Sequence, residues 1–252
     1  MHMAGQKMNR KKRNELFHSI LRWIYPPRCP VCDGVIAEDL LIHEKCRKKL
    51  VFVEEPRCCH CGKTLPSASQ EYCLDCSRKR TGENPIRQGR GLLEYSDSAK
   101  KMMYRFKYSN RSCYSEFFAR ETEERYEDWL KRISVDVIIP VPMNKRKEKK
   151  RGYNQAREFA NYLGRRLHLP VDGSVVKRVK DTKALKLLSP QERKNNLKNA
   201  FQVDKIIVEY RKILLVDDIY TTGSTVETIA EQLLKAGAGE VYFFTVCIGN
   251  GF

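Results

Sequence analysis

The sequence has no apolar run long enough to cross a membrane. No segment of its 252 residues reaches the roughly 20 consecutive apolar residues that a membrane-spanning helix needs. The stretch 16–25 is rich in apolar residues, but it is short and contains His18 and Arg22. No small-residue cleavage site follows it, which argues against a signal peptide. We therefore predict a cytoplasmic protein with no membrane span.

Two common phosphate-binding motifs are also missing. A P-loop needs a glycine-rich run that ends in Gly-Lys-Ser/Thr, and a dinucleotide fingerprint needs three spaced glycines. The hydroxyl-rich turn around Gly223 has a single glycine, and no lysine follows it. A phosphate bound at this turn therefore needs a different set of donors.

Acidic residues are scarce relative to basic ones. The chain has 31 Asp and Glu against 48 Lys and Arg, which gives a formal net charge of +17. Such an excess favours nucleic acid, an anionic membrane or a phosphate-rich ligand as partner, although a solvated basic surface has the same composition. Part of it lies in residues 1–28, which we predict to be a basic tail followed by a short amphipathic helix that ends at Pro26-Pro27.

Ten cysteines in a cytoplasmic protein indicate metal binding rather than disulfides. Eight Cys and His residues form four pairs, each with a two-residue gap that lets both side chains reach one tetrahedral ion. We predict a zinc-binding module at residues 29–76 with two Zn²⁺ ions in sequential sites, although interleaved pairing is open. The predicted ligands are Cys29, Cys32, His43 and Cys46 for the first site, and Cys58, Cys61, Cys73 and Cys76 for the second.

These sites read as structural, because protein ligands fill every position and leave none for a catalytic water. Basic residues surround the ligands, so the module is also a candidate contact for nucleic acid or for a protein partner. The remaining isolated cysteines, Cys113 and Cys247, are interpreted as small core residues.

Apolar strands alternate with helices after a charged linker at residues 77–90, which predicts a parallel α/β domain over residues 91–252. Strands are expected near 91–95, 135–141, 174–180, 200–203, 213–216 and 240–248, all in one sheet. Helices are expected near 97–106, 114–132, 153–168 and 226–234. The polar segment 181–196 is predicted to be a flap over the site.

The stretch 213–225 carries the clearest chemistry. A buried strand is expected to end at Asp217-Asp218, followed by a hydroxyl-rich turn and a helix. The turn and the helix N-terminus suit an anion, whereas the carboxylates suit a diol or a metal. Together these groups predict a ribose 5-phosphate site, although a buried strand with a capped helix and no ligand is the alternative. The phosphate-binding residues are expected to be Thr221, Thr222, Gly223, Ser224 and Thr225.

Six cations lie within residues 145–151, in a segment interpreted as a loop at the carboxyl end of the preceding strand. Repulsion between them predicts a loop that stays mobile until an anion binds. Pyrophosphate is the expected guest, with Lys145, Arg146 and Arg151 stabilising its departing charge. A solvated basic loop is the alternative.

The stretch 213–225 resembles the phosphoribosyl-pyrophosphate (PRPP) motif of type I phosphoribosyltransferases, which implies that Asp217 and Asp218 hold the ribose hydroxyls. The whole chain resembles the ComF family of competence proteins. That likeness rests on the cysteine pairs, Phe106-Lys107-Tyr108, Pro140-Val141-Pro142, residues 151–155, Arg193 with Asn196, and the PRPP motif. It implies a parallel-sheet type I phosphoribosyltransferase fold with a small N-terminal zinc-ribbon module, and it adds Pro142 to the PRPP site. His43 departs from the family, which usually has cysteine there.

The resemblance implies a competence factor for DNA uptake that binds single-stranded DNA and Mg²⁺-PRPP, with a DNA-translocating helicase as a further partner. An active phosphoribosyltransferase that uses a nitrogenous acceptor is the alternative. Aromatic side chains would stack with the bases of a single strand. The candidates are Trp23, Tyr25, Phe52 and Tyr72.

Overall fold

The computed structural model describes residues 26–37, 39–78, 84–179, 199–203 and 210–250. Its centre is a four-stranded parallel sheet in the order β1-β6-β5-β2. The strands are β1 (Gln88–Glu94), β2 (Val137–Pro140), β5 (Lys212–Tyr220) and β6 (Glu240–Ile248). The predicted tail helix and the predicted flap lie outside the described residues.

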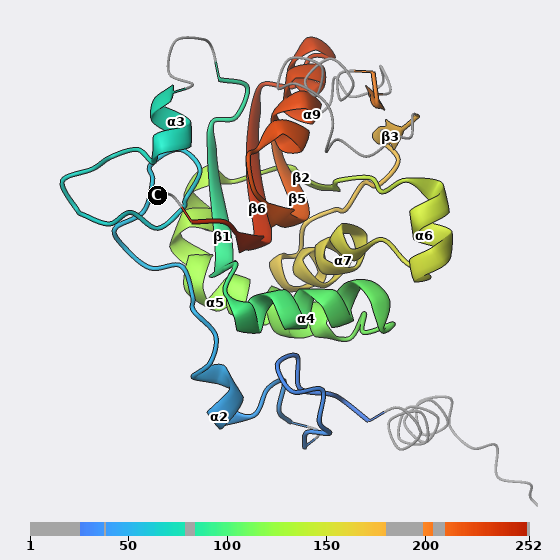
Figure 1. Cartoon of the computed structure of the whole chain (residues 1–252). Helices are drawn as coiled ribbons and strands as arrows, with labels where there is room; N and C mark the ends of the chain where they lie inside the picture. The colour runs from blue at the N-terminus through green and yellow to red at the C-terminus, as the bar shows by residue number, and fades with distance from the viewer. Residues whose placement is uncertain (1–25, 38, 79–83, 180–198, 204–209, 251–252) are drawn as a thin grey trace, which may run out of the picture.

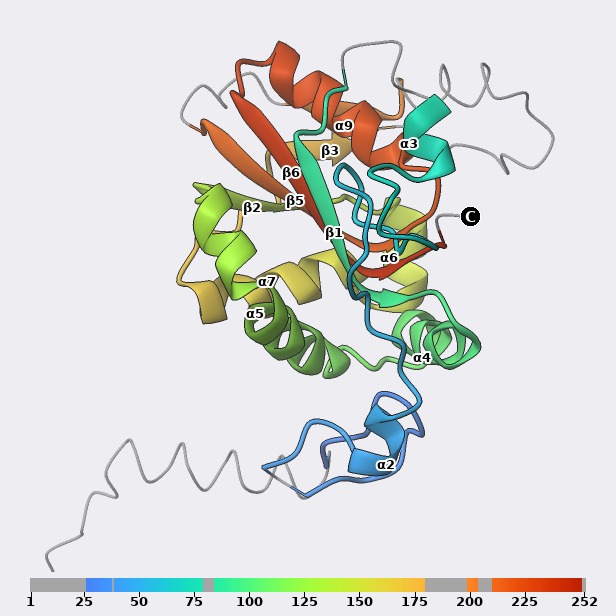
Figure 2. The same cartoon turned by 90° about the vertical axis from the view of Figure 1, so that its left-hand side faces the viewer.

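Helices cover both faces of the sheet (Figures 1 and 2). One face carries α4 (Asp97–Tyr108), α5 (Tyr114–Ile133) and α7 (Gln155–Leu167), and the other carries α9 (Ser224–Lys235). Residues alternate between the two cores along β5, because Leu214 and Val216 pack toward α7 whereas Ile213 and Leu215 pack toward α9. A strand buried on both faces explains the unbroken apolar run in the sequence.

Polar caps fix where the helices begin. The Ser96 hydroxyl accepts a hydrogen bond from the Ala99 amide at the start of α4, and the Asn154 side chain does the same for Ala156 and Arg157 in α7. Each bond satisfies an amide that has no partner inside its helix. No helix in the described ranges is both long enough and apolar enough to cross a membrane.

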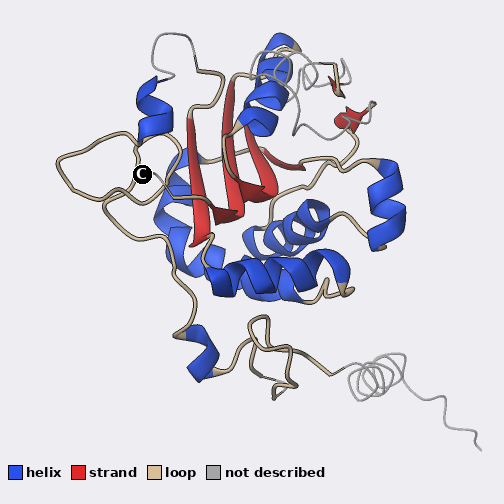
Figure 3. Ribbon diagram, in the orientation of Figure 1, coloured by secondary structure: helices blue, strands red, loops and turns tan. Residues whose placement is uncertain are grey.

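Two parts of the predicted sheet differ in the structure (Figure 3). β3 (Val176–Arg178) and β4 (Phe201–Val203) form a separate antiparallel pair instead of joining the parallel sheet. β5 does not end at the aspartates but continues to Tyr220, because residues 217–220 stay in register with Thr245 to Ile248 of β6. Pairing with the long neighbouring strand therefore outweighs the low strand propensity of aspartate.

The predicted basic loop is instead a short helix, α6 (Lys145–Arg151). Asn144 caps its first turn by accepting from the amides of Arg146 and Lys147, and Gly152 ends it at φ +86°. Lysine and arginine are good helix formers, and a helix spreads their charges around its axis. The prediction for Cys113 was also wrong, since this residue is exposed, whereas Cys247 is fully buried as predicted.

The N-terminal segment wraps around the edge strand β1. Residues 51–53 run antiparallel beside it, with the Val53 amide bonded to the Leu92 carbonyl and the Glu94 amide bonded to the Val51 carbonyl. The part before this crossing includes α2 (Glu44–Arg47) and packs with α4 and α5, whereas the part after it includes α3 (Leu74–Arg78) and packs with α9. The two cysteine clusters consequently lie on opposite faces of the sheet (Figure 2).

Candidate functional site

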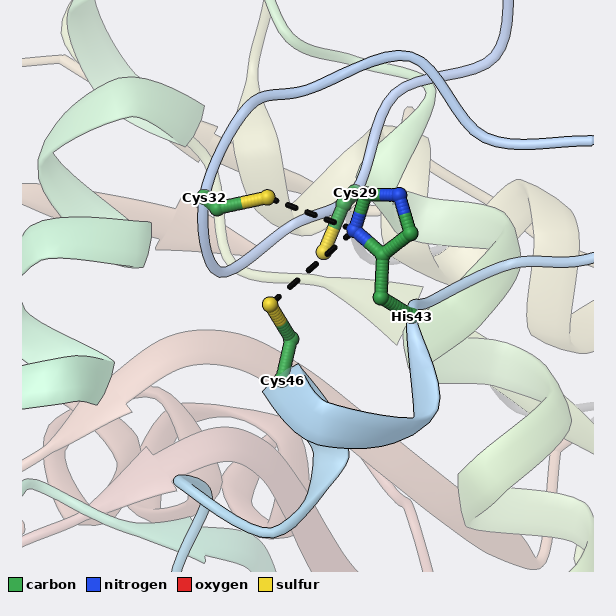
Figure 4. A group of neighbouring side chains, drawn as sticks. All are labelled: Cys29, Cys32, His43 and Cys46. Atoms are coloured by element: carbon green, nitrogen blue, oxygen red, sulfur yellow. Dashed lines mark hydrogen bonds between the residues drawn. The ribbon is translucent and has the colours of Figure 1, made fainter.

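The first metal cluster joins two short turns of the chain. Cys29, Cys32, His43 and Cys46 place their donor atoms within 4.8 Å of one another (Figure 4). Tetrahedral Zn²⁺ with bonds of about 2.3 Å to sulfur needs donor separations near 3.8 Å. The His43 Nδ1 lies 3.3 Å from the Cys32 sulfur and 4.0 Å from the Cys46 sulfur, so this set fits one ion.

The His43 ring is oriented so that its Nδ1 can bind the metal ion. Its Nε2 lies 3.1 Å from the Val35 carbonyl oxygen, which can only accept a hydrogen bond. Nε2 is therefore the protonated nitrogen, and the lone pair of Nδ1 faces the three thiols. A backbone carbonyl that fixes the tautomer of a histidine ligand is a common outer contact at zinc sites.

One thiol of this cluster, that of Cys32, is inclined to ionise, whereas burial and the neighbouring thiols raise the pKa of Cys46 to about 11. Burial opposes ionisation of Cys32, but hydrogen bonds from the Gly34 amide and from Cys29 outweigh it and lower the Cys32 pKa to about 7. The thiolate is the form that binds metal, so a lowered pKa favours ion binding at neutral pH.

The second cluster contains four buried cysteines. Cys58, Cys61, Cys73 and Cys76 have their sulfurs within 4.8 Å of one another, and the Cys61 and Cys73 sulfurs are 3.6 Å apart. This set also fits one tetrahedral ion. The structure thus brings together the sequential sets rather than interleaved ones. Cys59 and His60 belong to neither cluster in the described residues.

The first cluster is docked on the α/β domain through its Cys29–Cys32 turn. Asp33, just after this turn, accepts two hydrogen bonds from the Arg111 guanidinium, at 2.6 and 2.8 Å, and one from the Tyr114 hydroxyl at 2.7 Å. These bonds lower the pKa of Asp33. Arg105 of α4 adds a bond to the Val31 carbonyl. The metal turn and α4 are therefore held together by charge-assisted contacts.

The predicted PRPP residues gather at the carboxyl end of β5. Asp217 and Asp218 lie near the C-terminal end of β5, and the following turn and the start of α9 line a small cleft of about 40 Å³. Gly223 has φ +82° and is the N-cap of α9, so the amides of the first helical turn have no partner within the helix. The cleft and the helix N-terminus, which we call the anion cradle, offer amide donors that suit a small anion.

Tyr220 fixes the shape of this turn. Its ring is 5% exposed and stacks on Phe243, with ring centroids 4.5 Å apart. A Cβ added to Gly223 would come within 2.4 Å of the Tyr220 hydroxyl oxygen, so the close approach requires glycine. Tyr220 belongs to the same core as the four cysteines of the second cluster. The second metal cluster consequently supports the wall of the anion cradle.

The two aspartates have different surroundings. Loss of hydration, together with the neighbouring charge of Asp218, raises the pKa of Asp217 to about 7. Asp218 instead pairs with Lys107 of α4, whose Nζ lies 2.9 Å from its carboxylate oxygen. One carboxyl thus sits near its titration point at neutral pH, and the other is held as an ion pair.

Lys107 is a residue of the site to which the sequence assigned no role. The signal was present, because Phe106-Lys107-Tyr108 is part of the family likeness, but nothing local connects it with a residue 111 positions away. Phe106 is fully buried and anchors α4, which directs the next residue toward Asp218.

The other predicted residues lie around the same edge of the sheet. The register of β2 aligns Pro140 with Val216, the residue before the acidic pair, and Pro142 follows two residues after the end of β2. Lys145 and Arg146 are exposed at the start of α6. Arg151 ends α6 and bonds the Tyr108 hydroxyl and the Gln155 side chain, each at 3.0 Å, so it faces α4 and α7.

The aromatic candidates for base stacking fare differently. Phe52 is covered, because the Arg125 guanidinium lies 3.6 Å from its ring centroid and Arg47 lies 5.5 Å away. Tyr72 is partly buried against the core of the second cluster. Trp23 and Tyr25 lie outside the described residues. Of the four candidates, the two that the structure describes are therefore both partly buried.

Known proteins show the same division of the chain. Residues 20–77 match the double zinc ribbon domain, and residues 122–251 match the phosphoribosyl transferase domain. These matches and the cysteine clusters support zinc as the metal, and the second match and the parallel sheet show a phosphoribosyltransferase fold.

Two curated relatives cover most of the chain. "Competence protein F" of Haemophilus influenzae is 34% identical over 85% of this chain and 93% of its own length. "Competence protein ComFC" of Bacillus subtilis is 29% identical over 86% of this chain and 93% of its own. Among solved structures, the glutamine PRPP amidotransferase of B. subtilis is 19% identical over 55% of this chain and 26% of its own, with a TM-score of 0.36.

Proposed function

Because this chain belongs to the ComF family of competence proteins, we propose that it handles single-stranded DNA and binds Mg²⁺-PRPP at the end of β5. The observation that carries the PRPP part is the placement of Asp217 and Asp218 beside an anion cradle on one strand end. Ligands of parallel α/β sheets bind at this edge. The carboxylates would accept the ribose hydroxyls, and the turn 221–225 would hold the 5-phosphate.

In this proposal Lys107 holds one carboxylate until the ligand arrives. Its ion pair with Asp218 keeps that side chain in place without ligand, and both groups are mostly buried, at 18% and 16% exposure. A ribose hydroxyl would replace or share this contact. Lys107 is thus proposed as a positioning residue that acts through Asp218.

Zinc would act structurally at both clusters, with the eight predicted side chains as ligands. All ten cysteines are described and none forms a disulfide. Thiolate ligands need a reducing environment, which supports the proposed cytoplasmic location. The family resemblance further suggests a DNA-translocating helicase as partner, and its co-purification with the tagged full chain is the test.

Calorimetry of the zinc-loaded full chain with Mg²⁺-PRPP tests the proposed site. We expect saturable binding by the wild type and at least a tenfold weaker Kd for the double variant Asp217→Asn, Asp218→Asn, since both hydroxyl acceptors are altered. Asp128→Asn is the matched control, because it makes the same change at an exposed position of α5. Equal binding by the wild type and the double variant would remove the basis for the site.

Single-stranded DNA binding has its own signature. Neutralising phosphates with Lys and Arg releases counterions, so affinity for a labelled oligonucleotide should fall steeply between about 50 and 200 mM salt. Binding that ignores salt over this range would contradict the proposed use of the net charge of +17.

An active phosphoribosyltransferase is the second candidate, favoured by the basic helix α6 at the carboxyl end of β2. A nitrogen nucleophile would attack the anomeric carbon of PRPP and displace pyrophosphate, whose charge Lys145, Arg146 and Arg151 would stabilise. Pyrophosphate release is measured with a panel of nucleobases and nucleotides. PRPP binding without release under any of these conditions would leave the site as a ligand pocket.

A further inference from the structure

The outer face of α4 carries an arrangement that packing does not explain. Tyr104 and Tyr108 are 64% and 54% exposed. In the described part of the chain, the other exposed large hydrophobic side chains are all Val or Leu. The opposite face of the helix holds Met102, Met103 and Phe106, all at most 1% exposed, so the orientation of α4 is fixed. The two tyrosines are therefore held toward solvent by a rigid helix.

The two rings form a continuous surface. Their spacing of four residues places them on one side of the helix, and their centroids are 5.0 Å apart with an angle of 47° between the planes. Arg151 of α6 continues this surface, because its guanidinium lies 4.8 Å from the Tyr108 ring centroid and donates a hydrogen bond to the Tyr108 hydroxyl. Figure 1 shows α6 just beyond the C-terminal end of α4.

Cations accompany the rings on both helices. Lys100, one turn before Tyr104, and Lys101 are exposed on α4. Lys149 and Lys150 are exposed on α6. Aromatic rings interleaved with cations on a rigid face are the features that bind single-stranded nucleic acid, since the bases stack on the rings and the phosphates meet the charges.

We infer that this stripe, formed by Lys100, Tyr104, Tyr108 and Arg151, is the surface on which a single strand of nucleic acid binds. The inference rests on the proposed DNA-handling function and locates it on the phosphoribosyltransferase domain instead of the zinc ribbons. Charge complementarity selects the occupant, because a polyanion with unstacked bases satisfies both the cations and the exposed rings.

The stripe also borders the PRPP site. Lys107 lies between the buried Phe106 and the exposed Tyr108 in the chain, and its side chain pairs with Asp218. A strand bound on one side of α4 and PRPP bound on the other would therefore share this helix.

The test measures binding of a fluorescein-labelled oligothymidylate of about 20 nucleotides to the zinc-loaded full chain by anisotropy. Tyr104→Ala and Tyr108→Ala should each weaken binding by about fivefold or more, since base stacking contributes on the order of this factor per ring. Tyr104→Phe keeps the ring and should bind within about twofold of the wild type. Tyr104→Leu keeps an apolar side chain without a π face and should lose affinity like Tyr104→Ala.

Charge variants give a second readout. Lys100→Gln should reduce the slope of log affinity against log salt by about 0.7, the value for one phosphate contact with a single strand. Lys131→Gln is the matched control, because Lys131 is an exposed lysine of α5 paired with Glu127 in the same helix, as Lys100 is with Asp97 in α4. It should leave the slope unchanged.

The outcomes separate this inference from the function on which it rests. A wild type that binds the oligonucleotide while both alanine variants bind it equally well overturns the stripe but leaves DNA handling intact. A wild type that fails to bind at about 50 mM salt overturns both. Affinity lost by Tyr104→Ala and retained by Tyr104→Phe supports stacking on this face.

Discussion

Asp217 gives the sharpest prediction, because its role in the site conflicts with the stability of the unliganded fold. Its pKa is raised from 3.8 to about 7 by loss of hydration and by the charge of Asp218. The native carboxyl therefore keeps its proton up to about pH 7, whereas the unfolded chain releases it near pH 4. The native state binds more protons between these values, so the free energy of unfolding falls as the pH rises from about 4 to about 7.

The size of the effect follows from the shift. A rise of about three pKa units corresponds to about 4 kcal/mol at 1.36 kcal/mol per unit. Asp217 is only partly buried at the cleft, so solvent screening reduces this ceiling and we expect about 1–2 kcal/mol. Asp217→Asn should therefore stabilise the protein by this amount at pH 8 and by much less at pH 5, while it weakens PRPP binding.

Urea unfolding at pH 5 and at pH 8 measures the difference. The gain of Asp217→Asn over the wild type should be clearly larger at pH 8 than at pH 5. Asp218→Asn removes only the second cause of the shift, so its pH dependence should become shallower without disappearing. Asp128→Asn, exposed on α5, should follow the wild type. Equal stability differences for Asp217→Asn at both pH values would refute this explanation.

Three further predictions concern the parts that support the site. Gly223→Ala should lower the free energy of unfolding by about 1–2 kcal/mol because of the left-handed backbone at this position, and further because the new Cβ would clash with the Tyr220 hydroxyl. Tyr220→Phe should partly relieve this clash, which a double-mutant cycle of unfolding free energies measures. A chelator should remove zinc from the first cluster before the second, because Cys32 is exposed whereas all four cysteines of the second cluster are buried. A colorimetric indicator should therefore show metal release in two phases. Release in a single phase would contradict this order. Arg47→Met should destabilise the fold by about 1–3 kcal/mol in thermal unfolding, because the Glu121 carboxylate is buried and Arg47 is one of its two arginine partners. An unchanged Tm would mean that Arg125 alone is enough to pair with this carboxylate.

The sequence by itself determined the local features of this protein. Two-residue gaps among Cys and His residues identified the four ligand pairs, which the structure then combined into sequential sets, and the apolar run before Asp217 identified the central strand. The periodicity of apolar residues predicted α4, α5 and α7 to within a few residues. Each of these depends on neighbours in the chain, because helix and strand periodicity and ligand spacing are short-range properties.

Tertiary structure decided which distant segments meet. Pairing with β6 extended β5 through the two aspartates, and the position of α4 brought Lys107 to Asp218. The crossing of residues 51–53 over β1 placed the two zinc clusters on opposite faces of the sheet, one docked on α4 and the other behind Tyr220. These contacts depend on packing between elements far apart in sequence, and no local pattern specifies them. The sequence therefore predicted which residues belong to the proposed site, whereas only the fold decided which distant side chains lie beside them.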